Sequence, residues 1–388
     1  MRTPRGHPEG TGGTSPREQR RNNQRGLSMR AYVFPGQGSQ MKGMGSSLFD
    51  EFEDLTRAAD AILGYSVRTL CVEDPDGLLD QTQYTQPALY VVNALSYYRK
   101  VRETGLVPDF TAGHSLGEFN ALLAAEAFDF ETGLRLVRKR GELMSRVSGG
   151  GMAAVLNASE EEIRAVLEEN RLTSIDLANF NTPSQVVISG RAEDIKAAQP
   201  FFQTGNHLFV PLRTSGAFHS RHMEPVRAEF ADFLADVPVS GLRIPVISNV
   251  TARPHESGLV KENLAKQMVS PVQWSRSVEY LLGHEGMELE EIGHGDVLTK
   301  LVRKIRREIP DVRTRADSTP KRPKANADET VRRWNEKYPV GTRVRSTGGN
   351  YENLVTATEA TVLFGHRAAI YMHGYQGYFD ITEIEPVS

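Results

Sequence analysis

Apolar and polar residues alternate along the first three quarters of the chain in blocks that predict short buried strands followed by helices. The apolar run Arg30–Phe34 reads as a buried strand and passes into a glycine-rich turn. Helical periodicity follows from Leu48 to Leu63, and Gln86–Leu95 is apolar on most sides, as in a buried helix that carries Pro87 in its first turn. Strands that alternate with helices imply a largely parallel sheet, so we expect an α/β domain.

The stretch Ala112–Glu118 predicts a strand, a sharp turn and a helix, and it contains Gly-His-Ser-Leu-Gly. In a Gly-x-Ser-x-Gly turn the glycines let two backbone segments pass close together, and the following helix directs its N-terminal amides at the serine. This pattern makes Ser115 a candidate nucleophile. An ordinary glycine-rich turn with a capping serine is the alternative, because such a motif needs structural context.

Two further segments carry candidate chemistry. Phe130–Met144 predicts an amphipathic helix with several basic residues, most of which we expect to be exposed, as helix charges usually are. His219 stands in Gly-Ala-Phe-His, which suggests an enclosed histidine, although a lone histidine is more often structural than catalytic.

The pattern changes between Gly149 and Thr214, where short strands and helices alternate in the order βαββαβ. A capping box at Ser159 and Glu162 opens the first of these helices. This order predicts an inserted ferredoxin-like subdomain at 149–214, between large α/β parts at 29–148 and 215–309.

Both ends of the chain differ from this domain. Residues 1–28 are basic and nearly free of apolar residues, so we expect a disordered tail, or sequence upstream of a start at Met29. Residues 310–330 are rich in Pro, Lys and Arg and read as a linker, and 331–388 predict a small antiparallel β-barrel-like module. His366 and His373 form a candidate metal pair there, but a third ligand is not evident, so a structural role is favoured.

Composition sets the outer limits on function. The chain has 388 residues, 39% of them hydrophobic, and 46 basic against 49 acidic residues give a net charge of −3, which does not indicate a nucleic-acid or anionic-membrane surface. Cys71 is the only cysteine, which excludes an intramolecular disulfide and a cysteine-cluster zinc site. With no apolar run long enough to span a membrane and no signal-peptide pattern, we expect a cytoplasmic protein.

Six motifs in one order give the region from Arg30 to Ile309 its resemblance to a known family. The motifs are Phe34-Pro35-Gly36-Gln37-Gly38-Ser39-Gln40, Thr85-Gln86-Pro87-Ala88, Gly113-His114-Ser115-Leu116-Gly117-Glu118, Arg140-Gly141, Phe218-His219-Ser220 and Pro271-Val272-Gln273-Trp274. With these motifs the region resembles the malonyl-CoA:acyl carrier protein transacylases, including the stand-alone acyltransferases that serve polyketide synthases in trans. The implied fold is an α/β-hydrolase-like catalytic domain with a mostly parallel sheet and the ferredoxin-like insert.

The resemblance also implies roles for individual residues. Ser115 would be the nucleophile and His219 its general base, with the imidazole oriented by the backbone carbonyl of Gln267 instead of an acidic third member. The backbone amides of Gln37 and Leu116 would hold the oxyanion. The remaining implied roles are a carboxylate clamp at Arg140 and a shaping neighbour of the nucleophile at His114.

The family reaction implies a ping-pong transfer of malonyl from malonyl-CoA to the phosphopantetheine thiol of an acyl carrier protein, with no metal and no bound cofactor. Phe218, directly before the histidine, indicates malonyl selectivity, because its ring would crowd an α-methyl group. Gly216 departs from the histidine often found there in malonyl-selective synthase domains. His294, where fatty-acid enzymes often carry proline, favours the polyketide branch over fatty acid synthesis.

Alternatives of other classes remain at this point. They are an editing acyl hydrolase of the same fold, which should lack the arginine, an α/β-hydrolase esterase, which needs an acid before a late histidine, and a structural scaffold. The basic cluster Arg303, Lys304, Arg306 and Arg307 is a candidate contact for an acidic carrier protein.

Overall fold

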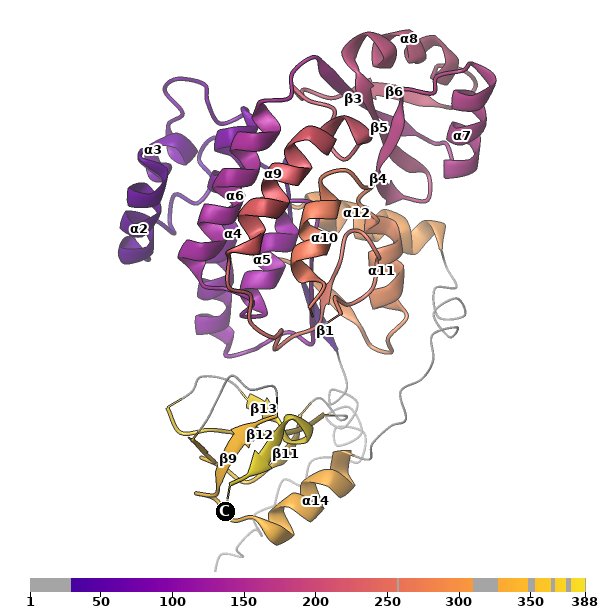
Figure 1. Ribbon diagram of the computed structural model, residues 1–388. Helices are drawn as coiled ribbons and strands as arrows, with labels where there is room; N and C mark the ends of the chain where they lie inside the picture. Colours follow the sequence, from indigo (N-terminus) through magenta and orange to yellow (C-terminus); the bar gives the residue numbers. More distant parts are fainter. Residues whose placement is uncertain are drawn as a thin grey trace, which may run out of the picture. The chain divides into compact units, whose positions relative to one another are not determined.

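The computed structural model describes residues 29–256, 258–309, 327–347, 353–363, 367–374 and 378–387. Two compact units form, one from Met29 to Pro320 and another that includes Lys321 to Ser388 (Figure 1). Each is described by itself.

The larger unit is built around a parallel sheet of four strands in the order β7-β2-β1-β8. The strands are β1 (Arg30–Phe34), β2 (Phe110–Gly113), β7 (Val246–Ile247) and β8 (Glu288–Glu291), and every neighbouring pair is parallel. The expected parallel sheet is therefore present. Strand β7 is short, since only two residues of the segment Ile244–Asn249 pair with β2.

Helices cover both faces of this sheet, and alternation along β1 divides the core in two. Tyr32 and Phe34 point into one buried cluster with α4 and α5, whereas Ala31 and Val33 point into another with α11 and α12. The helices are α2 (Glu53–Leu63), α3 (Val67–Val72), α4 (Thr82–Thr104), α5 (Gly117–Ala124), α6 (Phe130–Ser145), α9 (Glu224–Ala235), α10 (Val260–Gln267), α11 (Trp274–Leu282) and α12 (Val297–Glu308), with a 3-10 turn at η2 (Arg221–Met223).

Two sequence-based boundaries are wrong. Helix α4 begins at Thr82, so Pro87 lies inside the helix and not in its first turn. The extra turn makes local side-chain hydrogen bonds, in which Thr85 Oγ1 donates to the carbonyl of Leu79 at 2.6 Å and Gln86 Nε2 donates to Thr82 Oγ1 at 3.0 Å, and one tertiary bond, from Thr82 Oγ1 to Gln37 Oε1 at 2.9 Å. Helix α2 begins at Glu53, later than the expected Leu48, after a run of turns.

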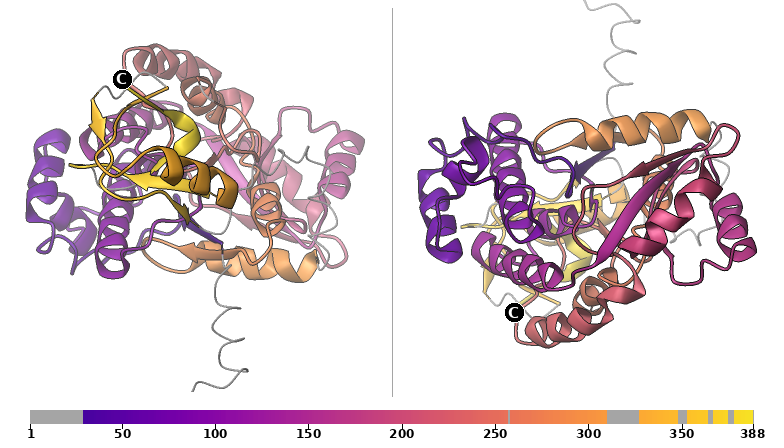
Figure 2. Two further views of the ribbon diagram at one scale, coloured as in Figure 1. Left: turned by 90° about the horizontal axis from the view of Figure 1, so that it is seen from below. Right: turned by 90° about the horizontal axis from the view of Figure 1, so that it is seen from above.

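A smaller antiparallel sheet occupies residues 150–211 of the same unit. It has the order β4-β5-β3-β6 and is formed by β3 (Gly150–Leu156), β4 (Asp176–Thr182), β5 (Gln185–Arg191) and β6 (Leu208–Pro211), with α7 (Glu160–Glu169) and α8 (Ala192–Phe202). The expected capping box of Ser159 and Glu162 opens α7. Figures 1 and 2 place this insert at the opposite end of the unit from α2 and α3.

The segment before α11 connects the smaller antiparallel sheet to the rest of the larger unit. Val272 exchanges two backbone hydrogen bonds with β4, from its own amide to Ala178 and from the amide of Phe180 to its carbonyl, each 2.9 Å long. The insert is thereby held against the loop that precedes α11.

In its described residues, the second unit combines the helix α14 with two small antiparallel sheets, β10-β9-β14 and β11-β12-β13. Its elements are α14 (Ala327–Lys337), β9 (Arg343–Ser346), β10 (Leu354–Val355), β11 (Thr361–Leu363), β12 (Arg367–Tyr371), β13 (Tyr378–Asp380), η4 (Ile381–Glu383) and β14 (Ile384–Pro386). Trp334, Val344 and Ile370 belong to its buried cluster.

Helix α14 begins inside the segment expected to be a linker, so the expected boundary at residue 331 falls within a helix. The sequence of this helix is strongly polar, and Val331 and Trp334 are the apolar residues that pack into the core. Of the candidate metal pair, His373 is exposed and His366 lies outside the described residues.

Candidate active site

Ser115 lies on a strained turn between β2 and α5. Its φ of 52° is in the left-handed region, which costs a residue with a Cβ on the order of 1–3 kcal/mol. Two glycines beside the turn leave no room for a side chain. A methyl group at Gly36 would lie 2.3 Å from the carbonyl oxygen of His114, and one at Gly117 would lie 2.0 Å from the carbonyl oxygen of Phe34. The loop after β1 and the serine turn are thus pressed together.

His219 contacts Ser115 directly. Its Nε2 lies 2.7 Å from Ser115 Oγ, and its Nδ1 lies 2.9 Å from the backbone carbonyl oxygen of Gln267. Because a carbonyl only accepts hydrogen bonds, Nδ1 carries the proton and Nε2 is left to accept one from the serine. Burial, and then the charge of Arg140, lower the pKa of His219 to about 3, so the imidazole is neutral near pH 7 and available as a base.

Arg140 of α6 reaches the same point from the other side. Only 1% of it is exposed, and its Nη2 donates to Ser115 Oγ at 3.1 Å and to Gln267 Oε1 at 2.8 Å. Its Nη1 donates to Gln86 Oε1 at 2.6 Å, whereas Nε is buried with no hydrogen-bond partner in the described part of the chain. Burial lowers the pKa of the guanidinium to about 10, which leaves it charged near neutral pH.

The two candidate oxyanion donors lie on the two backbone segments that meet at the serine. Leu116 is the N-cap residue of α5, where the helix presents amides outside its own ladder. Gln37 follows Gly36 in the loop after β1, and the Gln37 side chain accepts a hydrogen bond from Thr82 Oγ1 at 2.9 Å. A methyl group at Gly36 would lie 3.6 Å from the amide nitrogen of Leu116, so the two segments adjoin.

His114 and Phe218 flank the serine and histidine. His114 Nε2 lies 2.8 Å from Asn181 Oδ1 in the insert, its ring lies 5.7 Å from that of Trp274, and burial lowers its pKa. Phe218 is buried, and a methyl group at Gly216 would lie 2.6 Å from its ring. A side chain at position 216 would therefore displace this ring, which gives a physical reason for glycine there.

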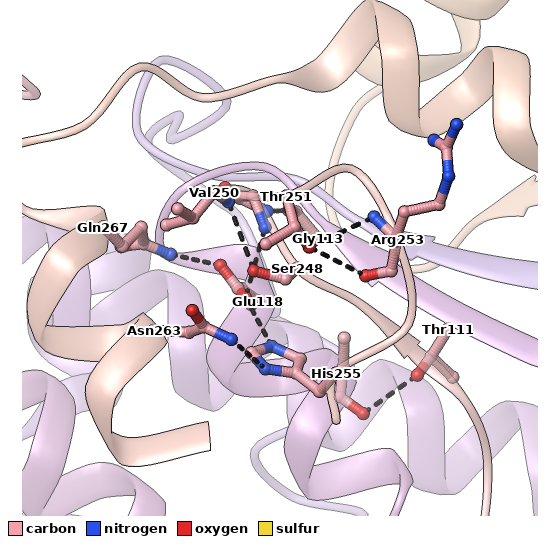
Figure 3. A network of polar contacts seen from close by, with 12 residues as sticks. Thr111, Gly113, Glu118, Ser248, Val250, Thr251, Arg253, His255, Asn263 and Gln267 are labelled. Atoms are coloured by element: carbon pink, nitrogen blue, oxygen red, sulfur yellow. Dashed lines mark hydrogen bonds and ion pairs between the residues drawn. The ribbon is translucent and has the colours of Figure 1, made fainter. Parts of the chain in front are cut away.

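Several polar residues around the site were not singled out from the sequence. Asn249 Oδ1 accepts the Ser115 amide hydrogen at 2.7 Å, and Asn249 Nδ2 donates to the carbonyl of Gly113 at 2.6 Å. Glu118 and His255 lie behind the turn with fully buried side chains (Figure 3). The position of Glu118 in the serine motif and the polar Ser248-Asn249 directly after an apolar strand are the signals that point to them.

Among the described residues, no group of three or more His, Cys, Asp or Glu side chains is arranged to hold a metal ion. No helix in the described ranges is long and apolar enough to cross a membrane.

The chain is similar to proteins of known description over its larger unit. The model of the acyl transferase domain family matches residues 31–330. The polyketide biosynthesis malonyl CoA-acyl carrier protein transacylase PksC of Bacillus subtilis is 55% identical over 282 residues, which cover 72% of this chain and 98% of that protein. A malonyl CoA-acyl carrier protein transacylase of Synechocystis is 41% identical over 285 residues, or 73% of this chain and 94% of its own.

Solved structures agree. A malonyl CoA-acyl carrier protein transacylase from Burkholderia pseudomallei is 56% identical with a TM-score of 0.72, covering 72% of this chain and 99% of that one. A type II polyketide synthase acyl-carrier protein in complex with its malonyl-transacylase gives 34% identity and a TM-score of 0.68, covering 72% and 93%.

Proposed function

Because the chain belongs to the acyl transferase domain family, we propose that it transfers malonyl from malonyl-CoA, through an ester on Ser115, to the phosphopantetheine thiol of an acyl carrier protein. Two relatives named for this reaction are 55% and 54% identical to the chain over 282 residues. The observation that carries the proposal is the buried guanidinium of Arg140 beside the Ser115 hydroxyl, with its Nε hydrogen unpaired.

Arg140 suits a substrate that ends in a carboxylate. Gln86 and Gln267 fix the plane of the guanidinium, and the unpaired Nε–H, together with the Nη2 hydrogen that Ser115 Oγ accepts in the free enzyme, would form the parallel fork that a carboxylate accepts in bidentate fashion. In a malonyl ester of Ser115 the free carboxylate is only a few bonds from Oγ, within reach of this fork. The charge of the substrate would also relieve the cost of burying the guanidinium.

In the first half-reaction His219 Nε2 takes the Ser115 proton as Oγ attacks the thioester carbonyl. The oxyanion that forms would be held by the backbone amides of Gln37 and Leu116, and a single such donor typically contributes ~10²–10³ in rate. Collapse of this intermediate breaks the C–S bond, and the departing CoA thiolate receives the proton from His219. The products are CoA and malonyl-Ser115.

The second half-reaction runs in the opposite sense. His219 takes the proton of the incoming carrier-protein thiol, whose sulfur attacks the malonyl ester, and the proton then returns to Ser115 Oγ as the ester breaks. The reactive thiol belongs to the partner's prosthetic group, so we propose that the enzyme needs no bound cofactor of its own.

Phe218 supports malonyl as the acyl group. The ring is buried directly before the catalytic histidine, and in this position it would collide with an α-methyl group. We propose that the enzyme loads the carrier proteins of a polyketide synthase in trans, and the names of the polyketide relatives support this. Malonyl transfer in fatty acid synthesis is the alternative.

The order of the strands in the sheets supports the finer assignments of the fold. We infer that residues 149–214 are a ferredoxin-like insert, since the βαββαβ order and the β4-β5-β3-β6 sheet have that topology. We infer likewise that the parallel sheet with its serine turn is the α/β-hydrolase-like core, and that the second unit, with its two small antiparallel sheets, is a β-barrel-like module.

A loading experiment tests the proposal. The protein is mixed with malonyl-CoA, acetyl-CoA or methylmalonyl-CoA, with and without holo carrier protein, and both proteins are followed by intact mass. We expect a malonyl adduct on the enzyme that passes to the carrier. An editing hydrolase would instead release the acyl group as free acid, and an inert scaffold would acquire no adduct.

A further inference from the structure

Glu118, His255, Asn263 and Gln267 form a buried cluster of polar side chains (Figure 3), which Gln267 connects to Ser115 and Arg140. Its centre is Glu118 on α5, whose side chain is fully buried together with that of His255. Carboxylates are seldom buried without strong compensation, because removing their charge from water is costly. The cluster therefore has to be explained by what surrounds the carboxylate.

The groups around Glu118 offer it hydrogen-bond donors. Oε1 lies 2.7 Å from His255 Nε2 and 3.3 Å from the amide of Asn249, and Oε2 accepts from Gln267 Nε2 at 2.5 Å. Asn263 Nδ2 lies 3.3 Å from His255 Nδ1, and since an amide nitrogen donates, the His255 proton is placed on Nε2, toward Glu118. This arrangement suits an ionised carboxylate.

Gln267 links this carboxylate to the reaction. It is fully buried, and its side-chain amide has an oxygen end and a nitrogen end with opposite requirements. The oxygen accepts from Arg140 at 2.8 Å, whereas the nitrogen donates to Glu118 and, at 3.1 Å, to the carbonyl of Ser115.

A flipped amide would fail at every one of these contacts. Its oxygen would face the carboxylate of Glu118 and the carbonyl of Ser115, and its nitrogen would face the guanidinium of Arg140. Of the two groups that the nitrogen meets, the charged Glu118 distinguishes the ends more strongly, because a hydrogen bond to a charged group is worth more than one to a neutral carbonyl. Glu118 thus decides which end Arg140 meets.

Glu118 also acts on Arg140 through its charge. Burial lowers the pKa of the guanidinium, and the Glu118 carboxylate is the group that opposes this shift. The two charges are separated by the Gln267 amide, so Glu118 stabilises the cation without occupying the fork that a substrate carboxylate would take.

We infer that Glu118, oriented by His255, is a positioning residue for acyl selection, which holds the Gln267 amide in the orientation that sets the Arg140 guanidinium for the carboxylate of the substrate. The inference rests on the proposed function, because it assigns the clamp a malonyl group. A residue that only supports the fold would affect loading by both substrates equally. Acetyl-CoA has no carboxylate for Arg140 to bind, so its loading should depend far less on Glu118.

Glu118→Gln tests this, because it keeps the shape and removes the charge. The measurement is the ratio of kcat/KM for Ser115 acylation by malonyl-CoA to that by acetyl-CoA. We expect the ratio to fall on the order of tenfold, mainly through a higher KM for malonyl-CoA, as for loss of one charge-assisted hydrogen bond. Equal losses with both substrates, or an unchanged ratio, would overturn the inference in favour of a merely structural role.

Asp109→Asn is the matched control. Asp109 is also a buried carboxylate of this unit and accepts the amide hydrogen of Arg30 at 2.8 Å, at the opposite end of β2 from the serine turn. We expect its malonyl-to-acetyl ratio to equal that of the unaltered enzyme. A fall as large as that of Glu118→Gln would show that loss of any buried carboxylate has this effect, and would overturn the inference.

A second variant and the unaltered enzyme complete the design. If Glu118→Gln does not fold, His255→Ala, which removes one donor and leaves the charge, should lower the ratio about threefold, and an unchanged ratio would overturn the inference. An unaltered enzyme that loads acetyl-CoA and not malonyl-CoA would instead refute the proposed function, so the two failures are distinguishable.

Discussion

Arg140 donates a hydrogen bond to the Ser115 hydroxyl across 3.1 Å, so the buried cation and the proposed nucleophile are in direct contact. The Ser115 hydroxyl is shared by the guanidinium and by His219 Nε2, which lies 2.7 Å away. A group bonded to Oγ must therefore come to lie beside the guanidinium. An acyl group that ends in a carboxylate fits this arrangement, and a neutral one leaves the cation uncompensated.

Replacing Arg140 by alanine should remove the preference for malonyl. We expect malonyl loading to fall on the order of 100-fold, as for loss of a bidentate charged pair, while acetyl loading changes little or improves relative to malonyl. Arg135→Ala on the exposed side of the same helix is the control and should leave both rates unchanged. An unchanged preference in Arg140→Ala would refute the clamp.

The rate of acylation should not show the fall near pH 6.5 that protonation of an ordinary histidine base would cause. The base is active when neutral, and with the pKa of His219 lowered from 6.5 to about 3, the rate should stay level as the pH falls from 7 to about 5. Pre-steady-state acylation by malonyl-CoA in a pH series measures this. A rate that halves near pH 6.5 would contradict the assignment.

The pH dependence of acylation should shift in Arg140→Ala. The charge of Arg140 is one of the causes that lower the pKa of His219, so removing it should raise that pKa and move the loss of activity to higher pH. Acetyl-CoA is the substrate for this comparison, because the variant is expected to keep its activity with acetyl-CoA. A profile identical to that of the unaltered enzyme would show that the two groups are not coupled.

Phe218→Val should relax discrimination against a branched acyl group. A smaller side chain leaves room for an α-methyl, and we expect methylmalonyl loading to rise about tenfold relative to malonyl. Single-turnover acylation with the two substrates gives the ratio. If both substrates change in parallel, Phe218 supports the site without selecting the acyl group.

The basic end of α12 is the candidate contact for the carrier protein. Arg303 and Arg307 are exposed there, and reversing both to glutamate should slow transfer to the carrier about tenfold at low salt while leaving acylation by malonyl-CoA unchanged. Arg57→Glu on α2 is the control, since Arg57 is an equally exposed arginine paired with acids of its own helix. An equal slowing of transfer in the double variant and in Arg57→Glu would contradict a local contact between α12 and the carrier protein.

Much of the fold was predictable from the chain because local signals were strong. Strand Arg30–Phe34 and the helix that begins at Phe130 lie where the apolar pattern places them, since each has one face or both in a core. Helix α14 was missed because its apolar face consists of little more than Val331 and Trp334. Pro87 misled because the helix already runs for more than one turn before it, and the contact of Thr82 with Gln37, 45 residues away, is not visible as a local pattern.

The site divides in the same way. The serine turn and the histidine were visible as motifs, and the structure brings Ser115, His219, Gln267 and Arg140 within hydrogen-bonding distance of one another. Asn249 and His255 come from the segment after β7 and meet α5 only through the fold, so spacing along the chain does not reveal them. Their roles in the reaction stay predictions.

The central claim is that malonyl passes through Ser115 to a carrier protein. The direct measurement is to load the enzyme with malonyl-CoA, remove excess substrate, map the adduct by peptide mass spectrometry, and then add holo carrier protein. We predict one malonyl ester on Ser115 that disappears from the enzyme and appears on the carrier thiol, and no adduct in Ser115→Ala. An adduct at another residue, or malonate released without reaching the carrier, would contradict the account.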